Sequence, residues 1–131
     1  MAETFQFDLV APSQLLLSEA VEEVVVPGSD GDFGILAGHA PFLATMRPGF
    51  ISVKRQGAEE RYFVRGGFAD TTTEGLTILA EEAVAEGDLT AEFVDKAIKE
   101  AEASVEKARD EAATSAAQLR LSQLQAVRST L

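Results

Sequence analysis

The chain has 131 residues, 46% of them hydrophobic, and a formal net charge of −11. This composition is typical of a folded protein, because disordered chains combine low hydrophobicity with high charge. The absence of cysteine excludes disulfides and thiolate metal sites. The negative charge argues against binding to nucleic acid or directly to anionic lipid. No stretch approaches the ~20 apolar residues of a membrane helix, and the first residues lack the pattern of a secretory signal.

The chain changes character at Gly87. All ten glycines and all four prolines lie at or before this residue, and none follows it. Glycine and proline mark the turns between short elements and are disfavoured inside helices. We therefore expect two parts: a β domain over residues 1–87 and a helical part over residues 88–131.

The first part begins with strand-like patterns. Phe5, Phe7 and Leu9 alternate with polar residues, the period of a half-buried strand. The β-branched run Val24–Val26 then stops at Pro27 and Gly28, which favours a strand followed by a turn.

Two hairpins are predicted next. Residues 49–54 and 61–65 are strand-like and flank Gln56-Gly57, and residues 71–73 and 76–80 flank Glu74-Gly75. A glycine between two β-rich runs is typical of a hairpin turn. Many short strands with regular turns indicate a sandwich or a barrel.

The second part has helical periodicity. Apolar residues recur at steps of three and four: Phe93, Ala97, Ala101, Val105, Ala108 and Ala112, then Ala117, Leu121, Leu124, Val127 and Leu131. Asp88 is the expected N-cap. A single helix over this part would be about 65 Å long. Ser115–Gln118 has the pattern of a capping box, so we predict an antiparallel helical hairpin with its bend between Arg109 and Ser115. Its alanine-rich seam buries little area, which predicts that the hairpin is weakly held.

No catalytic constellation is visible. His39 is the only histidine, and a lone histidine without cysteine favours neither a zinc site nor a nucleophile triad. The segment Gly28–Gly34 lacks the Gly-Lys-Ser/Thr ending of a phosphate loop and the further ligands of a calcium loop, so we interpret it as a turn. The neighbouring carboxylates Glu22-Glu23 and Glu81-Glu82 would point to opposite faces of a strand. We therefore expect an interaction module rather than an enzyme, with no metal or cofactor and no nucleotide site that can be assigned from the residues.

A longer motif carries a family resemblance. Val26–Pro41 resembles the signature of the ATP synthase epsilon subunit, which reads roughly Pro-Gly-x-x-Gly-x-x-Gly-Ile-x-x-x-His-Ala-Pro. Arg47–Gly49, Val64–Ala69, Thr77–Glu81 and Ala117–Leu121 resemble later parts of the family, so the resemblance covers essentially the whole chain. It implies an antiparallel sandwich of about ten strands followed by a two-helix hairpin.

The resemblance also implies a role and a set of contacts. Family members sit in the central stalk, bind the gamma subunit and the membrane ring of c subunits, and couple proton flow to ATP chemistry without catalysing it. By position, the expected contacts with ring and stalk are Asp32, His39, Ala40 and Pro41. No nucleic acid is expected, and membrane association would come through protein partners only.

The helical hairpin of the family also regulates. It extends and meets the alpha/beta catalytic head transiently through basic residues of the last helix, which here are Arg120 and Arg128. With only two such residues, we expect weak or absent inhibition of ATP hydrolysis. Some members bind ATP through Ile/Leu-Asp-x-x-Arg-Ala, but here Ile98 stands at the arginine position, three residues after Asp95.

Two cellular locations and one rival function remain as alternatives. The resemblance implies the cytoplasmic face of a bacterial inner membrane, with a mitochondrial matrix or chloroplast stromal face as the alternative. The rival function is a free-standing nucleotide-sensing or ligand-binding β domain.

Overall fold

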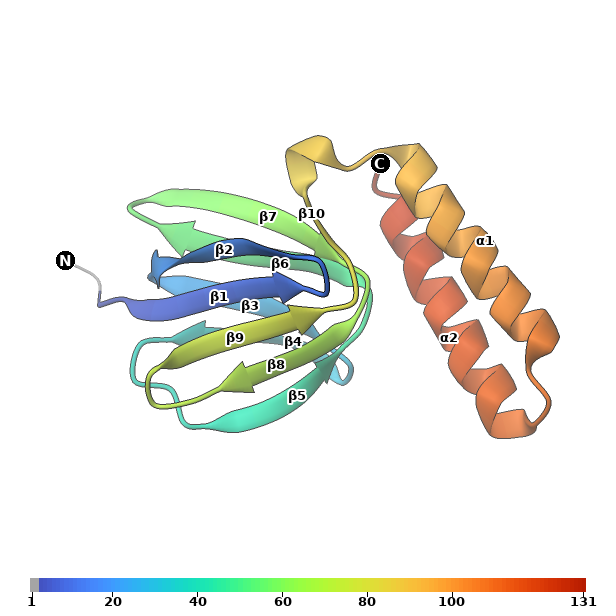
Figure 1. The fold of residues 1–131 in the computed structure, drawn as a ribbon, viewed down its shortest axis with the longest axis horizontal. Helices are drawn as coiled ribbons and strands as arrows, with labels where there is room; N and C mark the ends of the chain where they lie inside the picture. The colour runs from blue at the N-terminus through green and yellow to red at the C-terminus, as the bar shows by residue number, and fades with distance from the viewer. Residues whose placement is uncertain (1–2) are drawn as a thin grey trace. The chain divides into compact units, whose positions relative to one another are not determined.

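The computed structural model describes residues 3–131, and these residues form strands followed by two α-helices (Figure 1). The strands are β1 (Phe5–Ala11), β2 (Gln14–Val21), β3 (Glu23–Gly28), β4 (Gly31–Leu36), β5 (Phe42–Met46), β6 (Gly49–Arg55), β7 (Ala58–Val64), β8 (Gly67–Thr71), β9 (Gly75–Ala80) and β10 (Ala83–Ala85). A short 3-10 helix η1 (Glu86–Asp88) precedes α1 (Ala91–Lys107) and α2 (Glu111–Arg128). The predicted fold class, a β-sandwich followed by a helical hairpin, is confirmed.

The strands form one continuous sheet that folds over into two layers (Figure 1). Their order is β10-β7-β6-β3-β5-β8-β9-β1-β2, with β4 paired to β3. The sheet crosses between the layers where β3 and β5 share the single pair Gly28–Met46. One pair, β1 with β9, is parallel rather than antiparallel. Its two strands are far apart in the chain, as parallel pairing requires.

Both predicted hairpins form, but the first strand of the second one lies at Gly67–Thr71 rather than at residues 71–73. Strands β6 and β7 pair from Gly49–Val64 to Arg55–Ala58, and their turn is Gln56-Gly57. Both turn residues have positive φ, 49° and 77°, which suits the right-handed twist of the flanking strands. Strands β8 and β9 form the second hairpin. There, a Cβ on Gly67 would lie 2.0 Å from the Leu79 carbonyl oxygen, so only glycine fits beside this strand.

The core of the β unit comes from the inward positions of both layers. Phe7 and Leu9 are fully buried, as the alternating pattern predicted. They join a cluster that also contains Phe5, Val21, Val24, Val26, Ile35, Met46, Ile51, Val53, Tyr62, Val64, Ala69, Leu76, Ile78 and Ala80. Thr71 is buried among them, and its hydroxyl accepts from the Phe42 amide at 2.7 Å. Buried polar groups need such partners.

The helices form an antiparallel hairpin, but their caps differ from the prediction. Asp88 ends η1, and Thr90 caps α1 by accepting from the Phe93 amide at 3.1 Å. Asp110 caps α2 by accepting from the Ala113 amide at 2.7 Å. Ser115 lies inside α2, so the predicted capping box is wrong. Asp110 already satisfies a free amide at the beginning of the helix, as a good N-cap residue does.

The bend therefore lies at residues 108–110, at the N-terminal edge of the predicted segment. Ala108 is extended, with φ −66° and ψ 131°. This conformation ends α1 without a glycine or proline. The chain divides between Gly87 and Asp88 into two compact units, each with its own internal packing.

Candidate functional site

Asp32 lies near the beginning of β4, beside Pro27 in the β3–β4 hairpin. Its carboxylate accepts from Arg47 Nη2 at 2.5 Å, while Arg47 Nη1 donates to the Gly28 carbonyl at 2.6 Å. The Asp32 side chain nevertheless stays 60% exposed. A partner could reach this carboxylate, but it would meet an ion pair rather than an isolated charge.

His39 is bound into its own chain. Nδ1 lies 2.8 Å from the Leu36 carbonyl oxygen, and Nε2 lies 2.9 Å from the Thr72 carbonyl oxygen. Its ring also makes an edge contact with Phe5, with centroids 5.4 Å apart. A neutral imidazole carries one N–H and can donate to one of these carbonyls, whereas an imidazolium donates to both. His39 thus ties the β4–β5 loop to the β8–β9 turn and to β1.

The four residues expected to form contacts do not form one patch. Asp32 precedes most of β4, whereas His39, Ala40 and Pro41 follow its end at Leu36. Four strand residues span about 13 Å, so Asp32 lies at one end of the sandwich and the other three at the opposite end. Ala40 and Pro41 are exposed there, while His39 is half-buried. Any contacts through these residues involve two separate surfaces.

A third surface emerges from the pairing register of the strands. Phe68 pairs with Leu79, Leu79 with Val10, and Val10 with Leu15. Directly paired residues lie on the same face of a sheet. Their alternating neighbours Ala69, Ile78 and Leu9 point into the core. An outward apolar row therefore crosses β8, β9, β1 and β2, and it consists of Phe68, Leu79, Val10 and Leu15. Figure 1 shows these four strands side by side.

This apolar row is exposed. Phe68 is 49% exposed, Leu79 48% and Leu15 59%, and Val10 is half-buried. The next row on the same face contains the polar residues Asp70, Thr77 and Asp8, with Leu43 at its edge. Single exposed apolar residues are ordinary, but a contiguous group bordered by polar residues marks a contact surface. Sequence reasoning missed the row because it depends on pairing between distant strands. The sequence feature that could have revealed this row is the presence of large apolar residues at strand positions where the alternation predicts outward-facing side chains.

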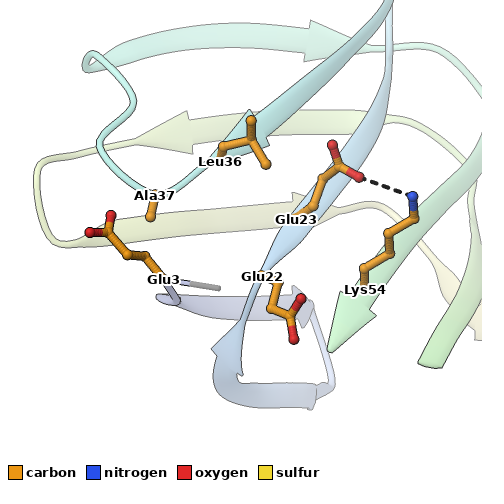
Figure 2. Close-up of a pocket in the computed structure, with 6 residues that line it drawn as sticks. All are labelled: Glu3, Glu22, Glu23, Leu36, Ala37 and Lys54. Atoms are coloured by element: carbon orange, nitrogen blue, oxygen red, sulfur yellow. Dashed lines mark ion pairs between the residues drawn. The ribbon is translucent and has the colours of Figure 1, made fainter. Parts of the chain in front are cut away.

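An open cavity of about 380 Å³ lies beside the ends of β3, β4 and β6, lined by Glu3, Glu22, Glu23, Leu36, Ala37 and Lys54 (Figure 2). Glu23 pairs with Lys54 at 3.3 Å, and Glu22 accepts from the Gln56 amide at 2.7 Å. Glu22 lies in the bend before β3 and Glu23 lies in the strand, and Figure 2 shows their carboxylates pointing away from each other. Within residues 3–131, no group of three or more acidic or histidine side chains is arranged to hold a metal ion.

The two titratable groups with a perturbed pKa, Glu60 and Tyr62, lie together on β7. Arg55 donates to Glu60 at 2.5 Å, and the Tyr62 hydroxyl donates to Glu60 at 3.0 Å. The hydrogen bond from Arg55 and the weaker one from Tyr62 lower the pKa of Glu60. Burial, with the Glu60 hydrogen bond second, raises the pKa of Tyr62. Arg55 also pairs with Glu19 of β2. These contacts form a structural network that connects β6 and β7 to β2.

The two arginines of α2 differ in their surroundings. Arg128, the last residue of α2, donates through Nε to Asp95 of α1 at 2.9 Å. Arg120 lies eight residues earlier, about 12 Å along the helix axis, and is half-buried. The two side chains therefore do not form one compact basic patch.

None of the helices in the described part of the chain is long and apolar enough to cross a membrane.

Comparison with known proteins identifies the family. Residues 4–86 match the model of the ATP synthase delta/epsilon chain β-sandwich domain. The ATP synthase epsilon chain of Parvibaculum lavamentivorans is 48% identical over 132 residues, covering 100% of both chains.

Solved structures agree with this assignment. A chain in the Euglena gracilis mitochondrial ATP synthase structure of OSCP, F1 and c-ring superposes with a TM-score of 0.73 at 26% identity, covering 97% of this chain and 81% of that one. A chain in the Tetrahymena thermophila central stalk and c-ring structure gives a TM-score of 0.69 at 12% identity, covering 97% and 98%, which shows a shared fold. The sandwich, the helical hairpin and the sequence match together establish that this chain belongs to the ATP synthase epsilon chain family.

Proposed function

We propose that the chain is a non-catalytic subunit of the rotor of an ATP synthase. In this role it links the gamma subunit to the membrane c-subunit ring and couples proton translocation to ATP synthesis and hydrolysis. A coupling element must transmit force through a body that does not deform. The sandwich suits this requirement because its core draws buried side chains from both layers.

The apolar row is the observation that carries the proposal. Phe68 and Leu79 lie half-exposed on adjacent strands of the stiff sheet, and Val10 continues the row onto β1. A few residues near the centre of a contact supply most of its binding energy, and aromatic residues such as phenylalanine are enriched at interfaces. We assign this row to the gamma subunit, because the contact that turns with the shaft needs lasting affinity rather than a transient charge pair.

The two ends of the sandwich then remain for polar contacts. Asp32, held by Arg47, offers a negative charge at one end. Ala40 and Pro41 are exposed at the other end, on a loop that His39 holds through Leu36 and Thr72. Contacts with the c-ring and stalk through Asp32 and through the His39 loop would therefore use these two ends separately.

Binding to gamma tests the proposal. Phe68→Asp places a charge in the apolar row without touching the core, so we expect at least a tenfold loss of affinity, as for a central contact residue. Thr77→Asn changes the polar row of the same face without adding a third carboxylate between Asp8 and Asp70, and it serves as the control, with less than a threefold effect. Equal binding by both variants, with folding intact, would remove the apolar row from the interface. Failure of the unmodified chain to bind gamma would favour the free-standing sensing domain.

For the hairpin we propose at most weak inhibition of ATP hydrolysis. Inhibition in extended form requires basic residues for the alpha/beta head, and Arg120 and Arg128 lie about two helical turns apart. Truncation after Gly87 should therefore change the ATPase rate of the assembled synthase by less than about twofold. A large increase on truncation would show a strongly inhibitory hairpin.

The same reasoning extends to nucleotide binding and location. Ile98 occupies the position of the phosphate-binding arginine, and Asp95 is already paired with Arg128, so we expect no tight ATP binding; micromolar affinity by calorimetry would contradict this. The bacterial relative at 48% identity supports a place on the cytoplasmic face of the inner membrane, held by protein partners.

A further inference from the structure

The ion pair between Asp95 and Arg128 joins the two helices at the open end of the hairpin. Asp95 is the fifth residue of α1, and Arg128 is the last residue of α2. Arg128 Nε donates to Asp95 Oδ1 at 2.9 Å across 33 positions of sequence. The covalent connection, residues 108–110, lies at the other end. The pair therefore connects the two helix ends that the backbone does not connect.

Packing is concentrated at the same end. The buried residues of the two helices are Val94, Ala97, Ala101, Leu124 and Val127. From residue 102 to residue 123, no side chain is fully buried. The hairpin is thus held where its ends meet and loosely packed near its bend.

We propose that Asp95 and Arg128 form a salt-sensitive latch that holds the helical hairpin closed. Both side chains are partly exposed, at 50% and 39%. Salt and competing carboxylates can therefore reach them.

The positions of the charges determine how the latch is tested. Arg128 lies in the last turn of α2 and also interacts favourably with the dipole of that helix, whereas Asp95 lies beyond the first turn of α1. Exchanging the two charges would place a carboxylate against the dipole at the C-terminus of α2 and would obscure the effect of the pair. The double-mutant cycle of Asp95→Asn, Arg128→Gln and their combination avoids this, because neutral side chains remove the pair without inverting the charges.

The chain has no cysteine, so cysteines at the exposed positions Lys99 and Gln125 can carry two spin labels in the full-length protein. The distance distribution between the labels reports opening. In low salt, each single variant should raise the open population about two- to fivefold, the range for an exposed ion pair. The double variant should add little more. High salt should open the unmodified chain toward the same level and leave Asp95→Asn nearly unchanged.

Glu102→Gln and Lys107→Gln are matched controls, because they remove one charge of each sign from exposed positions of α1. They should leave the distribution unaltered. The latch is refuted if Asp95→Asn and Arg128→Gln behave like these controls, or if their effects simply add. These measurements use the isolated chain, so they decide the latch whether or not the proposed rotor role holds.

Discussion

The β unit and the helical hairpin are stabilised in different ways. The β unit buries large side chains of both layers, including Phe7, Leu9 and Ile51, which are fully inaccessible. The hairpin buries five residues, of which two are alanines. Since hydrophobic stabilisation follows buried apolar area, we expect the β unit to be held more firmly than the hairpin.

The largest expected effect is a change in the core of the β unit. Phe7→Ala should lower the free energy of unfolding by about 3–5 kcal/mol, because it removes a fully buried ring and leaves a cavity. Phe68→Ala removes the same ring from the exposed apolar row and should cost less than about 1 kcal/mol. Urea denaturation followed by circular dichroism compares them. Equal losses would mean that the outward assignment of Phe68 is wrong.

A smaller effect is expected in the hairpin. Leu124 is fully buried, but two helices joined at one end can close around a truncated side chain, so Leu124→Ala should cost about 2 kcal/mol, the low end for such changes. Amide hydrogen exchange should speed up in α1 and α2 and stay constant in β1 and β9. Leu119→Ala, at a position that is 58% exposed, is the control. Faster exchange throughout both units would contradict their separate packing.

His39 provides a test of intermediate size within a loop. His39→Ala leaves the Leu36 and Thr72 carbonyls without their ring partner, which should cost about 1–2 kcal/mol. His39→Gln retains an N–H donor and should cost less. Urea denaturation followed by circular dichroism measures both changes in the free energy of unfolding. An unchanged midpoint for His39→Ala would mean that the imidazole is not holding the β4–β5 loop.

The smallest effect concerns pH. The pKa of Tyr62 is raised by burial and by Glu60, and the pKa of Glu60 is lowered by Arg55. The Glu60 contribution to stability is therefore present above its unfolded pKa of about 4.3 and is lost as the pH falls through the lower folded value. The Tyr62 contribution is present below about pH 10 and is lost as the pH rises through the higher folded value.

Tyr62 is the only tyrosine and the chain has no tryptophan, so ultraviolet absorbance follows its ionisation alone. Its midpoint should lie above the ordinary value of about 10. Glu60→Gln should bring the midpoint partly down, since burial remains. Glu59→Gln removes a carboxylate that accepts a hydrogen bond from the Ser52 hydroxyl. It should leave the midpoint of Tyr62 ionisation unchanged. No change with Glu60→Gln would show that the Tyr62 hydroxyl does not donate to that carboxylate.

Local patterns were enough to predict much of the fold. The alternation at Phe5, Phe7 and Leu9 and the glycine turn at Gly57 carry their information within a few residues, and both predictions were confirmed. Strand β2 was not predicted individually because Leu15, Leu16 and Leu17 interrupt its alternation. The caps were misplaced because Ser115 and Asp88 satisfy the same local rules as Asp110 and Thr90.

The candidate surfaces were harder to predict. The apolar row needs the register of four strands, including the parallel pair of β1 and β9. The latch needs the tertiary contact of Asp95 with Arg128. The separation of Asp32 from His39 follows from β4, a strand where the glycines had suggested a turn. In each case the deciding interaction lies far away in sequence, beyond the reach of periodicity.

The most direct test of the proposed rotor role is a titration of the chain into epsilon-depleted ATP synthase in membrane vesicles, with proton pumping driven by ATP hydrolysis as the readout. We expect the full chain to restore pumping and residues 1–87 to restore most of it, because the firm unit carries the proposed contacts. A chain that is folded and binds gamma but fails to restore pumping would contradict the coupling role.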